Sequence, residues 1–103
     1  MTTVSYDDLV ANLDAFIRTN KGGYSAYYIG ITKDIKARLF GYHKVDKDLN
    51  ICTCYKANSD KIARDVEQYF LAKGCDGGTG GGDESATFVY CYKISWNTVE
   101  REE

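Results

Sequence analysis

The stretch AYYIGITKDIKARLFGYH, residues 26–43, joins the pattern of a strand to the pattern of a helix. Its first part, extended back by two residues, is rich in aromatic and β-branched side chains, which predicts a strand over residues 24–32. Thr32 is a suitable cap for a helix over residues 33–43. Three apolar side chains recur at helical spacing on the face expected to meet the sheet: Ile35, Leu39 and Tyr42. A strand and a helix that packs back on it therefore form the expected nucleus of the fold.

Arg38 falls inside this apolar stripe, where a desolvated charge is costly unless it is paired. A second charge in an unusual place is Glu67, which shares a helix face with Ala63 and Phe70 and is expected to point toward the sheet. The two side chains could form a structural ion pair or extend outward to solvent. A cation and a carboxylate that converge on a tyrosine-lined sheet also suit phosphodiester hydrolysis.

The rest of the chain supplies the other elements of a small α+β domain. Amphipathic helices are predicted over residues 5–20 and 59–74, each after a serine cap, and further strands over residues 50–57 and 86–96. The Gly-rich segment 74–85 predicts a flexible connector, because it lacks the ending of a phosphate-binding P-loop and follows a helix. The expected fold is a three-stranded, mainly antiparallel sheet flanked by three helices.

Composition bounds the protein to one domain, residues 1–103. The chain has a net charge of −2, 44% hydrophobic residues and no apolar run long enough to span a membrane. No leader pattern is evident, so the expected location is the cytoplasm, that of the host cell if the protein is viral. The four cysteines are expected to be reduced core thiols. The alternative is a zinc site built from four side chains: His43, Cys52, Cys54 and Cys75.

Positive charge is concentrated in one part of the chain despite the acidic balance. Three lysines that we call the lysine group lie close to Arg38 in sequence: Lys33, Lys36 and Lys44. Such a concentration is typical of a surface that binds nucleic acid phosphates, although an ordinary solvated helix face has the same pattern.

These residues together resemble a known family. YYIG at residues 27–30, with Arg38 ten residues after Tyr28 and Tyr42 four residues later, is similar to the second half of the GIY-YIG nuclease signature. The incision domain of the bacterial excision-repair nuclease has the same Tyr, Arg and Tyr spacing. Lys33 also fits the pattern, and the resemblance covers about residues 26–74.

The resemblance implies a metal-dependent endonuclease that hydrolyses the phosphodiester bonds of DNA. Glu67, in the later helix, would hold one Mg²⁺ or Mn²⁺, and Arg38 would bind the phosphate oxygens. Tyr42 would orient water or phosphate. His43 is a fallback base, or else a solvated residue at the end of its helix.

The chain departs from the family pattern in two ways. No strand with the first motif tyrosine precedes YYIG, but residues 88–94 could pair beside it through circular permutation. Tyr90 would then replace that tyrosine and share with Tyr28 the part of the base, while Tyr92 is a rival for the role. The family's late asparagine has no counterpart, since Asn97 is poorly placed.

Two other functions remain open. A catalytically inactive relative, regulatory or viral, could bind nucleotides or nucleic acid through the same phosphate pocket. The last strand also alternates, which places five mostly aromatic side chains on one face: Phe88, Tyr90, Tyr92, Ile94 and Trp96. That face could bind a protein partner, or it could simply be core.

Overall fold

The computed structural model describes residues 2–78 and 84–101. Among them, four strands form one mixed sheet: β1 (Thr3–Val4), β2 (Tyr27–Thr32), β3 (Cys52–Ala57) and β4 (Phe88–Lys93). The order in the sheet is β1-β3-β4-β2, with β4 antiparallel to both neighbours and β1 parallel to β3. The predicted α+β class is confirmed.

The expected number of three strands is wrong, because β1 adds a fourth at the edge beside β3. Its two residues align with the end of β3, Thr3 with Lys56 and Val4 with Ala57. A strand of this length carries no alternating pattern, so only its pairing partner reveals it.

The two long helices begin and end where their capping residues predict. In α1 (Tyr6–Asn20) and in α2 (Asp60–Lys73), a serine side chain, Ser5 or Ser59, accepts a hydrogen bond from a first-turn backbone amide. α2 ends at Gly74, whose φ of +114° lies in the left-handed region that favours glycine. Both predicted helices are confirmed.

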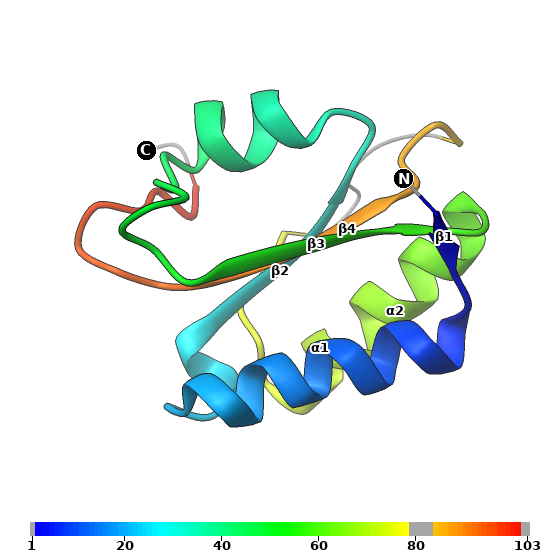
Figure 1. The fold of residues 1–103 in the computed structure, drawn as a ribbon, viewed down its shortest axis with the longest axis horizontal. Helices are drawn as coiled ribbons and strands as arrows, with labels where there is room; N and C mark the ends of the chain where they lie inside the picture. Colours follow the sequence, from blue (N-terminus) through cyan, green and yellow to red (C-terminus); the bar gives the residue numbers. More distant parts are fainter. Residues whose placement is uncertain (1, 79–83, 102–103) are drawn as a thin grey trace.

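The helices are divided between the two faces of the sheet (Figure 1). α1 and α2 cover one face, and the short helix η2 (Lys36–Tyr42) covers the other. Under α1 and α2 lies the larger core, which includes Leu9, Leu13, Phe70, Val89 and Cys91. Under η2 lies a smaller core of mainly aromatic side chains: Tyr28, Leu39, Val45, Tyr90 and Tyr92. The aromatic face of β4 is therefore buried.

β4 lies between β2 and β3, as the permuted arrangement requires. Its register places Tyr90 opposite Gly30 and Tyr92 opposite Tyr28. The strand ends earlier than expected, so Trp96 leaves the aromatic face and is 91% exposed in the loop that follows.

η2 starts later than expected and has wider turns than an α-helix. Thr32 stays in β2, and the side chain of Asp34, just before the helix, accepts a hydrogen bond from Ala37 N at 3.1 Å. The backbone forms a π-helix, in which His43 N donates to the carbonyl of Arg38, five residues back, at 3.0 Å.

The described beginning of the Gly-rich segment adds to the free edge of β2. Asp76 N donates to Tyr27 O, and Ile29 N donates to Asp76 O, both at 2.8 Å. The segment is therefore held against the sheet there, whereas residues 79–83 of the predicted connector lie outside the described residues. Within residues 2–78 and 84–101, no helix combines the length and apolar character needed to cross a membrane.

Candidate functional site

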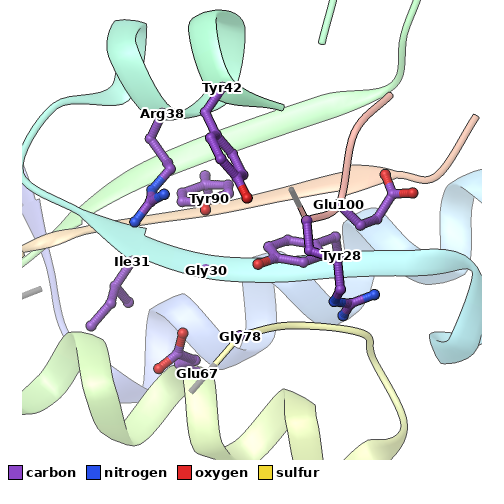
Figure 2. A pocket seen from close by; sticks show the side chains of 10 residues that line it. Tyr28, Gly30, Ile31, Arg38, Tyr42, Glu67, Gly78, Tyr90 and Glu100 are labelled. Carbon is purple, nitrogen blue, oxygen red and sulfur yellow. The ribbon is translucent and has the colours of Figure 1, made fainter. Parts of the chain in front are cut away.

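A cavity of about 200 Å³ lies beside the second half of β2. Its lining comes from β2, η2, α2, β4, the Gly-rich segment and the C-terminal segment: Tyr28, Gly30, Ile31, Arg38, Tyr42, Glu67, Gly78, Tyr90, Glu100 and Arg101. In Figure 2, Arg38 and Tyr42 extend from η2 on one side of β2, and Glu67 extends from α2 on the other. The cavity thus lies at the edge of the sheet, and helices from both faces of the sheet line it.

Five of the predicted site residues line this one cavity: Tyr28, Arg38, Tyr42, Glu67 and Tyr90. They are separated by up to 62 residues in the chain and come from four elements. Tyr90 lines the cavity, whereas its rival Tyr92 lies behind it and donates to Glu100 Oε2 at 3.0 Å. Arg38 and Glu67 do not form the alternative structural ion pair in the described part of the chain.

η2 presents Arg38 and Tyr42 to the cavity as a stacked pair. The guanidinium carbon of Arg38 lies 5.1 Å from the centre of the Tyr42 ring, a cation–π contact. Both side chains are half-buried, so the guanidinium keeps donors that face the cavity. This arrangement suits the recognition of an anion by a positioned arginine.

Glu67 is a carboxyl group held in an apolar setting. Its side chain is 5% exposed, on the face of α2 that also carries the buried Ala63 and Phe70. Burial raises the pKa of Glu67 to about 7, and the nearby charge of Arg64 opposes this only in part. A cation in the cavity would offset the cost of ionising this group.

Glu67 is the carboxylate that the cavity could offer to a Mg²⁺ ion, whereas the expected zinc ligands do not lie together. Mg²⁺ is usually held by one or two carboxylates, water and substrate phosphates, which Glu67 at an open cavity can satisfy. The alternative zinc site is not assembled, because Cys52 and Cys54 pack against the core under η2 while Cys75 belongs to the opposite core. In the described ranges, no three His, Cys, Asp or Glu side chains cluster as a metal site.

Gly30 allows the Tyr90 phenol to lie across β2. A Cβ atom built at Gly30 would be 2.4 Å from both Cζ and Oη of Tyr90, a distance that no real side chain tolerates. The glycine of the YIG motif is therefore needed for space. Burial raises the pKa of Tyr90 well above its usual value, so its phenol stays protonated at neutral pH.

His43 is buried behind the cavity and is not the solvated helix end that was one of the two expectations. Its Nδ1 lies 2.6 Å from Val99 O and its Nε2 lies 2.8 Å from Tyr90 Oη. Because a carbonyl oxygen can only accept, we assign the proton to Nδ1, which leaves Nε2 to accept from the Tyr90 phenol. Burial lowers the pKa of His43, which favours this neutral state.

Sequence reasoning missed the C-terminal wall of the cavity. Glu100 and Arg101 line it, and Arg101 Nη2 lies 2.6 Å from Oδ1 of Asp76 in the Gly-rich segment. The charged tail carries no motif, so only the position of the end of β4 beside β2 could have indicated this role.

The lysine group lies outside the cavity, and all three side chains are exposed. Lys36 and Lys44, with Phe40 and Lys47, line a separate groove of about 550 Å³ on η2 and the loop after it. Asn97 is also absent from the cavity lining, since its amide bonds to Asn50 at 2.7 Å.

Comparison of the chain with protein-family models, curated proteins and solved structures finds no match. Its function is therefore inferred from the cavity itself.

Proposed function

We propose that this protein is a metal-dependent nuclease of the GIY-YIG type, circularly permuted, that hydrolyses phosphodiester bonds in DNA. The observation that carries the proposal is the meeting of Tyr28, Arg38, Tyr42, Glu67 and Tyr90 in one open cavity. These are the residues that the resemblance assigns to the site, and β4 supplies the strand that the chain lacks before YYIG.

Arg38 binds the phosphate in this proposal. Its guanidinium donates to the non-bridging oxygens and stabilises the charge that they gain as the bond to the attacking water forms. Tyr42 stacks on Arg38 and keeps the guanidinium directed at the cavity. Arg38 should therefore matter more to the transition state than a lysine in the same place could.

Tyr90 and His43 together accept the proton of the attacking water. A buried phenol with a raised pKa is a poor base by itself, because its anion is not formed at neutral pH. As the water loses a proton to Tyr90 Oη, the phenol passes its own proton to Nε2 of His43, 2.8 Å away. Nδ1 of His43 keeps its hydrogen bond to Val99 O, which stabilises the imidazolium that results.

Glu67 is the residue that would hold Mg²⁺ or Mn²⁺. When bound there, such an ion would supply positive charge to the leaving oxygen. Glu67 itself would provide a carboxylate on the α2 side of the cavity, whereas the other lining carboxylate, Glu100, accepts hydrogen bonds from Tyr92 and Thr98. Tyr28, stacked on Tyr92 at 5.3 Å between ring centres, forms the wall between Arg38 and the C-terminal segment.

A catalytically inactive binder of nucleotides or nucleic acid is the second candidate. The observation that favours it is the position of Asn97, whose amide is occupied by Asn50 and lies away from the cavity. Such a binder would hold a phosphate with Arg38 in the same way but would not hydrolyse the phosphodiester bond.

The two candidates separate in one experiment. The protein is incubated with single-stranded, duplex and branched DNA and Mg²⁺ or Mn²⁺, as wild type, Arg38→Ala and Glu67→Gln. A nuclease cuts at least one substrate, and both variants lose cutting. Binding without cutting that Arg38→Ala abolishes identifies the inactive binder, and no DNA binding by wild type would refute both the nuclease and a binder of DNA. Arg18→Ala, on the exposed face of α1, is the matched control.

A further inference from the structure

The cavity contains a second guanidinium that the resemblance does not assign. Arg101 lines the same wall as Tyr28, and the charges of Arg101 and Arg38 both act on the Tyr28 phenol. Arg101 follows β4, whose last residues pair with the start of β2, so it comes from the end of the strands opposite to the turn that leads into η2. Two cations therefore flank one aromatic wall.

The two carboxylates near this wall, Glu100 and Asp76, both have hydrogen-bond partners in the protein. Glu100 accepts the hydrogen bond of Tyr92, and its Oε2 also lies 2.8 Å from Thr98 Oγ1. Asp76 pairs with Arg101 through one contact of 2.6 Å, and its Oδ1 also accepts from Gly77 N at 2.8 Å. A guanidinium has five donors, so this pairing leaves most of those on Arg101 for a further anion.

We propose that Arg101 forms a second phosphate subsite, which binds the phosphate adjacent to the one held by Arg38. This inference rests on the proposed function and adds to it a substrate class, a strand with at least two consecutive phosphates. Asp76 is the partner of Arg101 when no strand is bound, and binding of the phosphate does not depend on this pairing. Nucleic acid meets this requirement at every internal position, whereas a mononucleotide does not.

The alternative is that the Arg101 contact is only a surface ion pair. Its arginine side chain is 61% exposed, and exposed pairs of this kind add little to stability. A similar pair joins Arg18 and Asp14 at 2.7 Å on α1, remote from the cavity, and it provides a matched control. If Arg101 binds phosphate, the loss of its charge weakens binding of the strand whether or not Asp76 is present. If the contact is only an ion pair, the loss of either partner has the same effect.

The test is a double-mutant cycle in which one change removes the charge of Arg101 from the protein and the other removes the charge of one phosphate from the strand. Binding and cleavage are measured with short single strands in which the phosphate on the 5′ side, the 3′ side or neither side of the central one is an uncharged methylphosphonate. Wild type, Arg101→Gln, Asp76→Asn and Arg18→Gln are compared. Wild type should lose about tenfold in affinity or kcat/KM when one flanking phosphate is neutralised. Arg101→Gln, which already lacks the contact, should bind and cleave the methylphosphonate strand almost as well as it does the unmodified strand.

Each outcome decides a different point. Asp76→Asn and Arg18→Gln should behave as wild type, because they leave the Arg101 guanidinium free to bind. Equal sensitivity of wild type and Arg101→Gln to both methylphosphonates overturns the subsite while the proposed function stands. Equal defects in Arg101→Gln and Asp76→Asn would mean that the ion pair is structural, which also overturns it. If wild type neither binds nor cuts any strand, the proposed function itself fails.

Discussion

Replacing Glu67 by glutamine should make the folded protein more stable above pH 7 when no divalent ion is present. The carboxyl group is 5% exposed and lies against the apolar face of α2, so its ionised form is poorly solvated. Glutamine has nearly the same shape and carries no charge. The substitution therefore removes the cost of burying a carboxylate while it keeps the packing.

The magnitude follows from the pKa of Glu67, about 7 in the folded protein against an ordinary value of 4.5. Between these values the folded state holds a proton that the unfolded chain has lost, so the free energy of unfolding falls as pH rises through this window. The difference corresponds to about 3 kcal/mol above pH 7. For a domain of this size that is a shift in Tm on the order of 10 °C.

Urea unfolding in EDTA at pH 4.5 and pH 8 checks this prediction. The two proteins should have similar stability at pH 4.5, and Glu67→Gln should be the more stable at pH 8. Lowering of the His43 pKa by burial gives the opposite slope below pH 6.5, but it affects both proteins equally and cancels in their difference. Glu84→Gln, a substitution at an exposed glutamate, is the control.

Adding Mg²⁺ at pH 8 separates a metal-binding carboxylate from one that is only buried. If Glu67 holds the ion, Mg²⁺ at ten times its Kd stabilises wild type by about 1.4 kcal/mol and leaves Glu67→Gln unchanged. A Glu67→Gln protein that is less stable than wild type at pH 8 in EDTA would refute the reasoning. The carboxylate would then have a partner inside the protein that glutamine cannot replace.

Further substitutions test the site and the lysine group. Gly30→Ala places a methyl group against the Tyr90 ring and should cost about 2 kcal/mol of stability in thermal unfolding, whereas Gly41→Ala, with 3.6 Å to its nearest neighbour, should cost nothing. His43→Gln removes the acceptor of the Tyr90 proton and should slow cleavage by about a hundredfold without weakening DNA binding; cutting at the wild-type rate would exclude the relay. Each alanine substitution in the lysine group should lower the slope of log K against log salt by about one if that lysine contacts a phosphate, and Lys61→Ala on α2 should not.

The elements of the fold were largely predictable because their signals are local. Serine caps mark both long helices, a glycine stop marks the end of α2, and alternation marks β4. β1 and the π-helix were missed for a common reason. A strand of two residues is defined by its partner, and the spacing of Ile35, Leu39 and Tyr42 does not distinguish α turns from the π turns of η2. Neither is encoded in the pattern of one segment.

The residues of the candidate site that match the spacing of the family motif were predictable from the sequence. The contacts that depend on strand register or on residues far apart in the chain were not. Arg38, Tyr42 and Glu67 carry recognisable spacings, and all three reach the cavity. The role of Gly30 as space for Tyr90 requires the β2–β4 register, which the sequence suggests only through permutation. The contact of His43 with Tyr90 joins residues 47 positions apart, so no local pattern could reveal it.

The order of the strands explains why the C-terminal tail belongs to the site. β4 is last in the chain and central in the sheet, so the segment after it must leave beside β2 and η2. Val99 exchanges two hydrogen bonds with His43 there, through the backbone amide to His43 O at 2.8 Å and through the carbonyl to Nδ1 at 2.6 Å. A chain whose corresponding strand came first would have no tail at this position. The late position of β4 in the chain therefore places both Val99, the partner of His43 Nδ1, and the guanidinium of Arg101 beside the cavity.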